Sequence, residues 1–220
     1  MKKVESAHVF LVNTGNIRAE LGLWRELWSK EGRFAVAIED ARGTPVSDNR
    51  NRAVKRFLQS GYGWMLMVDD DTIPTRNPLD LIYQNLDIVC FPTPMWNPGV
   101  IKHQPVYMNI EPLDKSGSDG ESIVMMNPDP LMEIVTGGSG CILIARRVLE
   151  HPDLRAPFMD AYDEDGIRVQ SEDITFIHRV RAAGFRAWAA MEYPCSHVKT
   201  VDLLRVHDEF RRAVAAARNA

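Results

Sequence analysis

Residues 64–72 read WMLMVDDDT, a fully apolar run followed by three aspartates and a threonine. Short apolar runs of this kind are typical of strands that are buried on both faces of a parallel sheet. In open α/β sheets, ligands bind at the carboxyl ends of the strands. The abrupt change from apolar to acidic residues therefore predicts a buried strand over 64–68 whose end opens into a ligand-binding site.

On both sides of this strand the chain alternates apolar runs with amphipathic stretches, which is the pattern of a helix-covered sheet. After residue 91 the chain is rich in Pro and Gly, and its short strands are predicted to be antiparallel. A polar loop is expected at 114–121, and glycines interrupt an apolar run over 131–144. We expect an α/β fold with a mixed, mainly parallel central sheet, flanking helices and a small antiparallel subsheet. The predicted strands are 8–13, 34–38, 64–68, 87–91, 104–110, 122–126 and 185–191, and the predicted helices are 17–30, 51–59, 78–84, 172–183 and 202–217.

Composition limits the classes of protein that the chain can belong to. Its 220 residues are 45% hydrophobic and 25% charged, as in one ordinary globular domain. The net charge of −4 is the opposite of the basic field that nucleic-acid-binding proteins use. The three cysteines are odd in number and far apart, which argues against a disulfide framework or a zinc knuckle. With no apolar leader and no run of 18 apolar residues, we expect a cytoplasmic protein without a membrane span.

The aspartate triplet is the strongest candidate for a metal site. Alternate residues of an extended chain share a face, so Asp69 and Asp71 are expected to point together and Asp70 to point away. Two converging carboxylates repel each other unless a cation lies between them. Mg²⁺ or Mn²⁺, with open coordination sites for diphosphate oxygens, would satisfy them. The alternative is a solvated acidic turn.

Two further candidates lie late in the chain. Glu172 and Asp173 follow Ser171 at the start of a predicted helix, where a carboxylate could act as a general base. The structural alternative is a serine cap followed by acids that interact favourably with the helix dipole. His197 follows the last predicted strand. If its loop returns beside Asp71, the imidazole would complete a mixed nitrogen and oxygen site that favours Mn²⁺.

Three weaker candidates complete the set. The run 136–140 (TGGSG) contains Gly137 and Gly138, which could let a substrate approach the backbone closely or could form only a bulge. The guanidinium of Arg50 could pair with a phosphate, with surface solvation as the alternative. Trp96 could stack on a sugar ring.

Taken in order, the segments RNRAV (50–54), VDDDTIP (68–74), TGGSGCILIARRVL (136–149), SEDITFIHRVRAAGFR (171–186) and SHV (196–198) resemble the GT-A fold glycosyltransferases. The likeness is to the large family-two-like group that transfers sugars from nucleoside diphosphates, and it covers about residues 8–198. It implies a Rossmann-like GT-A fold. It also implies a nucleotide-binding half over 1–92, an acceptor and metal half over 93–200, and a C-terminal amphipathic helix over 201–220.

The resemblance also implies roles for single residues. Asp69 and Asp71 would be the DxD pair, with Asp71 as the direct ligand of Mn²⁺ or Mg²⁺ and His197 completing the metal site. Asp173 would be the base of an inverting transfer, with Glu172 beside it. The implied partner is a nucleotide-sugar donor, UDP- or GDP-linked. The residues expected to bind substrates are Glu39, Asp40, Arg50, Asp69, Asp70, Trp96, Gly137 and Gly138, with Glu39 and Asp40 placed after the second strand.

Two other functions remain open from the sequence. A nucleotidyltransferase also combines an α/β sheet with paired carboxylates and a metal, but residues 13–20 (NTGNIRAE) supply little of the Gly-rich, Lys-containing loop expected after its first strand. A nonenzymatic sugar-binding or partner-binding module would use the acids and His197 only structurally. The C-terminal helix is expected to pack against its own domain, with a homo-oligomer contact or adsorption to an anionic membrane as alternatives.

Overall fold

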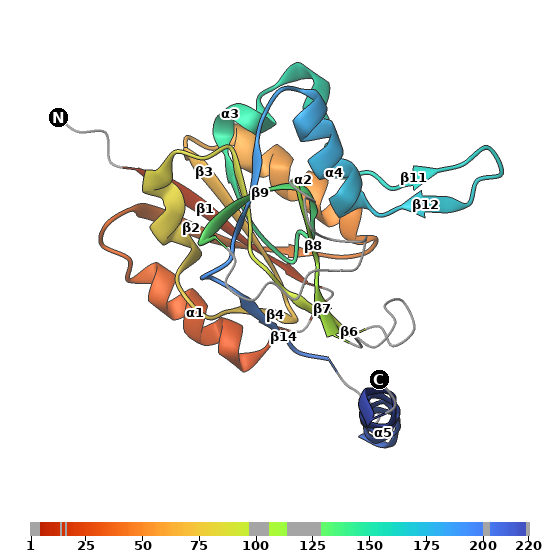
Figure 1. Ribbon diagram of the computed structural model, residues 1–220. Helices are drawn as coiled ribbons and strands as arrows, with labels where there is room; N and C mark the ends of the chain where they lie inside the picture. The colour runs from red at the N-terminus through yellow and green to blue at the C-terminus, as the bar shows by residue number, and fades with distance from the viewer. Residues whose placement is uncertain are drawn as a thin grey trace.

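The computed structural model describes residues 5–13, 15, 17–96, 106–113, 129–199 and 203–218. Eight strands form its central sheet (Figure 1). Across the sheet they are β2 (Ala35–Arg42), β1 (Ser6–Asn13), β3 (Trp64–Asp69), β10 (Cys141–Ala145), β5 (Ile88–Cys90), β13 (Ala187–Ala190), β9 (Leu131–Gly137) and β8 (Ile110–Pro112).

Six of the eight strands run in one direction, and β10 and β9 run opposite to them. β1 pairs in parallel with β2 and β3, and β5 pairs in parallel with β13. β10 runs antiparallel between β3 and β5, and β9 runs antiparallel to both β13 and β8. The expected mixed, mainly parallel sheet is therefore confirmed, and antiparallel β10 separates its two parallel parts.

The helices cover both faces of the sheet. On one face lie α1 (Ala19–Ser29) and the 3₁₀ helix η1 (Pro78–Gln84), joined by a hydrogen bond of 3.0 Å from Trp28 Nε1 to Asn77 Oδ1. On the other lie α2 (Val46–Gln59), α3 (Arg146–Leu149) and α4 (Glu172–Ala182). The Arg146 guanidinium donates to the Leu58 and Ser60 carbonyls and so fastens α3 to the end of α2. A second 3₁₀ helix, η2 (Pro152–Leu154), precedes α4.

Three small antiparallel sheets complete the described fold, which confirms the expected antiparallel part. β4 (Thr72–Pro74) pairs with β14 (Cys195–His197), and β6 (Pro94–Trp96) pairs with β7 (Val106–Met108). β11 (Ala161–Tyr162) and β12 (Arg168–Gln170) form a ribbon that projects from the body beside α4 (Figure 1). Within the described ranges, no helix combines the length and apolar character needed to cross a bilayer.

β3 is the buried strand that its apolar sequence predicts. Residues Met65 to Val68 have no exposed surface and Trp64 is 5% exposed. β3 lies between β1 and β10, so neighbouring strands satisfy its backbone on both edges and helices cover both its faces. Exposure begins at Asp69, where β3 ends, because that carboxyl end is not covered by helices.

Several expected boundaries were wrong. α2 begins at Val46 and not at residue 51, because its polar first turn follows Pro45 directly and the Asn49 side chain binds the Gly43 carbonyl. Glu39 and Asp40 lie within β2 and not after it, since pairing with β1 continues to Arg42. The strand expected over 104–110 is divided into β7 and β8. The loop at 114–121 and the strand at 122–126 lie outside the described residues.

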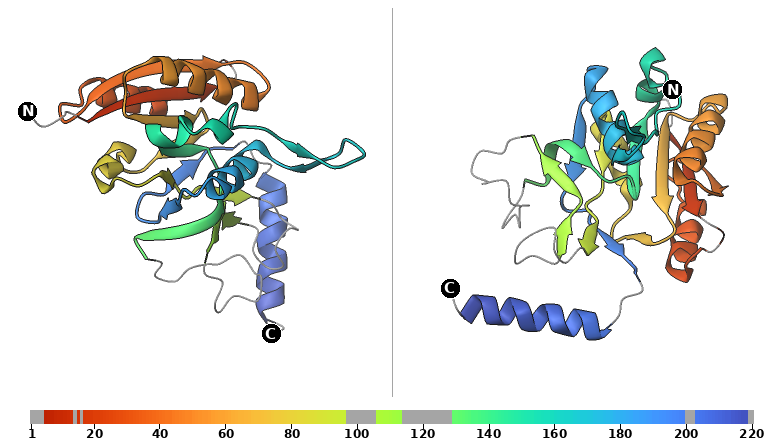
Figure 2. Two further views of the ribbon diagram at one scale, coloured as in Figure 1. Left: turned by 90° about the horizontal axis from the view of Figure 1, so that it is seen from above. Right: turned by 90° about the vertical axis from the view of Figure 1, so that its right-hand side faces the viewer.

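The C-terminal helix α5 (Leu203–Arg218) does not pack on the central sheet, contrary to expectation. Figure 2 shows α5 standing apart from the body of the fold. Leu203 is 78% exposed, Phe210 63% and Val214 50%. The physical reason is that other helices already cover both faces of the sheet.

Buried His8 provides a test of the fold. It stacks on Phe10 and Tyr62, and its Nε2 lies 3.1 Å from Glu39 Oε1. Burial lowers the pKa of His8 below its usual value of 6.5, although the Glu39 carboxylate opposes this shift. The unfolded chain therefore binds a proton more readily than the folded one. We expect the free energy of unfolding to fall as the pH drops below about 6.5, because protonation then favours the unfolded state.

His8→Phe should fit the same aromatic cluster and flatten this dependence in urea titrations from about pH 8 to pH 5. His207→Gln, which changes an exposed histidine of α5, serves as the control and should leave the wild-type slope. An unchanged slope in His8→Phe would show that another group causes the acid sensitivity.

Candidate active site

One pocket of about 260 Å³ lies at the carboxyl end of β3. It collects residues from α2, from the β3–β4 turn, from β6, from the start of α4 and from the segment that follows β14. Its lining residues are Val46, Arg50, Asp69, Asp71, Thr72, Thr93, Met95, Asn109, Gly138, Gly140, Glu172, Asp173, His197 and Lys199. Acidic and basic side chains from distant parts of the sequence therefore share one cavity.

Backbone pairing brings His197 to the aspartate triplet. β4 follows the triplet directly and pairs antiparallel with β14, which places His197 opposite Thr72. The Val198 amide then donates to the Asp71 carbonyl over 2.8 Å. The late loop therefore returns beside Asp71, which is the condition for a mixed site with His197, and a two-stranded sheet holds it there.

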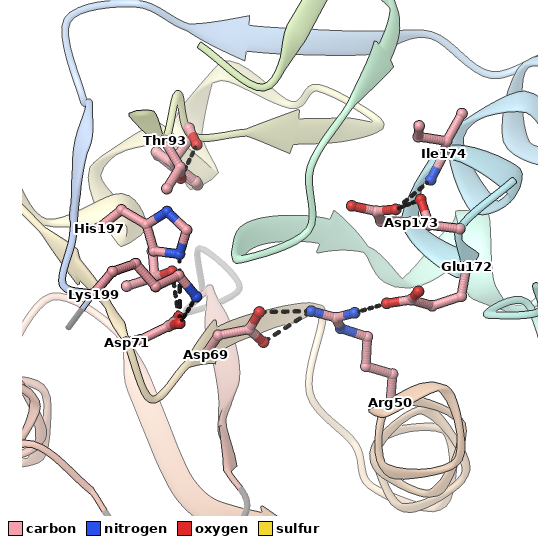
Figure 3. A network of polar contacts seen from close by, with 12 residues as sticks. Arg50, Asp69, Asp71, Thr93, Glu172, Asp173, Ile174, His197 and Lys199 are labelled. Carbon is pink, nitrogen blue, oxygen red and sulfur yellow. Dashed lines mark hydrogen bonds and ion pairs between the residues drawn. The ribbon is translucent and has the colours of Figure 1, made fainter. Parts of the chain in front are cut away.

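Arg50 lies between two carboxylates at the centre of the site (Figure 3). Its Nη2 donates to both Asp69 oxygens at 2.8 Å, and its Nη1 donates to Glu172 Oε1. The side chains of Arg50, Asp69 and Glu172 are 4%, 24% and 9% exposed. The alternative of a solvated Arg50 was wrong, because α2 packs against the sheet with this residue inward. Its terminal nitrogens bind carboxylates of the protein.

The charges of this triad support one another. Burial disfavours the charged guanidinium, but the nearby Asp69 and Glu172 carboxylates outweigh burial and raise the pKa of Arg50. Burial raises the pKa of Asp69 to about 6, although Arg50 opposes the shift. Arg50 is therefore the charged group that keeps two partly buried acids compatible with the fold.

Asp71 has different partners. Lys199 Nζ donates to Asp71 Oδ2, and His197 Nε2 lies 3.4 Å from the same oxygen. Burial disfavours the charge on Asp71, but the Lys199 ammonium outweighs burial and lowers the pKa of this carboxyl. Asp69 and Asp71 both line the pocket, as the alternation predicts, but each is bound to a different cation.

A divalent cation fits Asp71 and His197 better than it fits Asp69. His197 Nδ1 lies 2.8 Å from the Pro94 carbonyl, an acceptor, so Nδ1 is the donor of this contact and Nε2 is the nitrogen that faces Asp71. An imidazole nitrogen beside a carboxylate is a suitable donor pair for Mn²⁺. In the described part of the chain, no three His, Cys, Asp or Glu side chains converge as a metal site. Asp69 stays apart because Arg50 holds it.

Asp173 presents a carboxylate oxygen to the pocket from the start of α4. Its Oδ1 accepts from the Ser171 hydroxyl and from the Ile174 amide, the latter over 2.9 Å. Among the described residues, Oδ2 has no hydrogen-bond partner. Ser171 stands at the N-cap position but its side chain makes no capping hydrogen bond. The interpretation of Ser171 as a simple cap was therefore wrong, because its hydroxyl orients Asp173.

The glycine run forms one wall of the pocket. A Cβ on Gly138 would meet Asn109 Nδ2 at 1.9 Å, and a Cβ on Gly140 would meet Thr72 Oγ1 at 2.9 Å. Gly137 lies at the end of β9, where its missing side chain leaves room for Ile134 and the core residue Cys90. Gly140 thus lets the wall approach Thr72 and Asp69, whereas Gly138 leaves room for Asn109 and Gly137 serves packing.

Other predicted residues lie elsewhere. Glu39 is outside the pocket and pairs with His8 and Arg56, and Asp40 pairs with Arg25 and Arg42. Asp70 does not line the pocket, in agreement with its expected opposite orientation. Trp96 ends β6, and its side chain is not among those described.

The candidate site residues named from the sequence do not include seven of the lining residues: Val46, Thr72, Thr93, Met95, Asn109, Gly140 and Lys199. Asn109 has a structural role at the wall, because its Oδ1 accepts from the Thr93 amide and its carbonyl accepts from the Gly138 amide. Lys199 had a usable signal, since it lies two residues after His197 in an extended segment and so can share its face. Asn109 had none, because only the fold brings it to the glycine run.

The pairing of Arg50 with Asp69 and Glu172 predicts that replacing Arg50 lowers the free energy of unfolding more than replacing an exposed arginine does. Arg50→Met retains side-chain volume but leaves the Asp69 and Glu172 carboxylates without their cation. It should lower the free energy of unfolding by about 3–5 kcal/mol. Arg25→Ala, which removes an exposed ion pair with Asp40, is the control and should cost about 0–1 kcal/mol. Urea unfolding measures both, and equal losses would contradict the central role of Arg50.

Comparisons with known proteins show the fold alone. No protein-family model and no curated protein matches the chain. A197 from STIV has a similar crystal structure, with a TM-score of 0.56 at 17% identity over 89% of this chain and 86% of that chain. The structure of GalNAc-T7 with UDP, GalNAc and Mn²⁺ gives a TM-score of 0.48 at 8% identity over 92% of this chain and 45% of that chain. An apo UDP-glucose pyrophosphorylase gives a TM-score of 0.42 at 10% identity, covering 97% and 82% of the two chains.

Proposed function

We propose that the protein is a glycosyltransferase that moves a sugar from a nucleoside diphosphate to an acceptor hydroxyl. The observation that carries the proposal is that the free oxygen of Asp173 shares one pocket with Asp71, His197 and Lys199. A base thus faces a group of side chains suited to a diphosphate and its counterion. Group transfer needs both, one on each side of the reacting carbon.

Asp173 is the proposed general base. Its Oδ2 takes the proton from the acceptor hydroxyl while that oxygen attacks the anomeric carbon. The new carbon–oxygen bond forms as the bond to the diphosphate breaks, and the electron pair leaves with the nucleoside diphosphate. Attack from the opposite face inverts the anomeric centre. Ser171 and the Ile174 amide hold Oδ1, so the free oxygen is oriented before the acceptor binds.

The leaving group is assigned to the opposite side of the pocket. Asp71 and His197 would hold Mn²⁺ or Mg²⁺, which neutralises the charge that develops on the diphosphate. Lys199 brings a positive charge to the same place and is 50% exposed, so its ammonium has freedom to turn toward a phosphate. Arg50 binds both oxygens of Asp69, and we therefore assign Asp69 a supporting role beside the two proposed metal ligands.

Arg50 decides which acid is available for proton transfer. Its pairing with Glu172 occupies that carboxylate, which leaves the neighbouring Asp173 with a free oxygen. The two acids at the start of α4 therefore differ in role although they are adjacent. UDP- or GDP-sugars are the proposed donors.

The first test is donor binding. Thermal unfolding with UDP, GDP, CDP or dTDP should show a shift with one nucleotide that depends on Mn²⁺. At about 100 times the Kd, the expected rise in Tm is about 5–10 °C. Asp71→Ala should abolish this shift, because it removes one of the two proposed ligands.

The matched control is Glu192→Gln, which changes an exposed acid paired with Arg76 and should retain the shift. A full shift in Asp71→Ala would overturn the metal assignment. No shift with any nucleotide in the wild-type protein would favour the nonenzymatic module.

The second test separates binding from turnover. Asp173→Asn should retain the Mn²⁺-dependent thermal shift and lose about 10²–10⁴-fold in kcat, because the amide cannot accept the proton. Release of nucleoside diphosphate supports glycosyl transfer, whereas release of pyrophosphate from a nucleotide and a sugar phosphate would identify a nucleotidyltransferase. A product with retained anomeric configuration in NMR spectra would contradict the role of Asp173 as base.

A further inference from the structure

The β11–β12 ribbon, residues 159–170, exposes an unusual amount of apolar surface. It projects from the body beside α4 (Figure 1). Its four large apolar side chains are exposed. Met159 is 50% exposed, Tyr162 60%, Ile167 63% and Val169 63%. A two-stranded ribbon has little stability of its own, so apolar side chains gathered on one are typical of an interaction surface.

The ribbon is also acidic. Residues 159–170 contain four acids and one arginine. Asp160 pairs with Arg168 over 3.5 Å, and Asp163 Oδ1 accepts from two amides within the turn. Glu164 and Asp165 are exposed at the tip. The turn therefore presents negative charge next to the apolar side chains.

α5 has the opposite character. Its residues 203–218 contain four arginines and two acids. Leu203, Phe210 and Val214 are exposed on it, and Arg211 is exposed beside Phe210. Figure 2 shows that α5 stands apart from the central sheet. One chain thus carries an apolar, basic helix and an apolar, acidic ribbon.

We propose that α5 of one copy packs on the β11–β12 ribbon of a second copy, and that the exchange is reciprocal in a two-fold dimer. Each contact covers apolar side chains on both partners and brings Arg211 toward the Glu164 and Asp165 tip. Two-fold symmetry makes the contact twice, which helps reach the roughly 800 Å² per partner that stable interfaces bury. α5, with 16 residues, is about 24 Å long and can span the ribbon.

A second copy is favoured over a membrane by charge. An anionic lipid surface would attract the arginines of α5 but repel the acidic ribbon. A second copy satisfies both surfaces at once, because the helix and the ribbon have opposite charges and both are apolar.

Light scattering coupled to size exclusion measures the mass of the full chain directly. We expect the wild-type protein to be a dimer. Arg211→Glu alone and Glu164→Arg with Asp165→Arg should each weaken the dimer by about tenfold or more, because like charges then face each other. Combining all three substitutions should restore it. Glu26→Arg, a charge reversal on exposed α1, is the matched control and should remain dimeric.

A monomeric wild-type protein over the whole concentration range would overturn the proposal. A triple variant whose dimer is as weak as the dimers of its parent variants would also overturn it, because the two surfaces would then not face each other. A monomer that floats with phosphatidylserine vesicles, and loses this binding in Phe210→Ser, would assign α5 to a membrane instead. Ile167→Ser and Phe210→Ser should each weaken the dimer, and a dimer unaffected by both would also contradict the pairing.

Discussion

The buried guanidinium of Arg50 is the interaction on which the candidate site depends. It joins α2, the end of β3 and the start of α4, three elements far apart in sequence, by binding Asp69 and Glu172 at once. Two partly buried acids repel each other and are costly to remove from water. A cation that can donate hydrogen bonds in two directions is therefore required between them. Arg50 supplies that geometry from a helix packed against the sheet, and the remaining polar groups of the pocket are arranged around it.

The acids of the pocket have different roles because they have different partners. Asp69 and Glu172 share the cation of Arg50, Asp71 lies with Lys199 and His197, and Asp173 retains an oxygen that faces the pocket. Four carboxylates in one pocket thereby have three different environments. A transfer reaction requires such a difference, because the base must accept a proton while other groups hold charge on the leaving side.

At the periphery of the fold, the acidic β11–β12 ribbon and the basic helix α5 also have complementary charges. The β11–β12 ribbon leads directly to α4 and Asp173, whereas α5 follows the segment that carries His197 and Lys199. Both of the proposed dimer surfaces are therefore continuous in sequence with opposite sides of the pocket.

By itself, the sequence determined the buried strand over 64–68, the mixed parallel sheet and the candidate acids, because apolar runs and their polar ends reflect local periodicity and burial. It also indicated His197, because this residue follows the last predicted strand. Only the tertiary structure decided that Arg50 points inward, that Glu39 lies within a strand, and that Lys199 and Asn109 line the pocket. It also decided that α5 stands apart from the sheet. These outcomes depend on which segments meet across the sheet, and such contacts between distant residues leave no periodic signal in a single sequence.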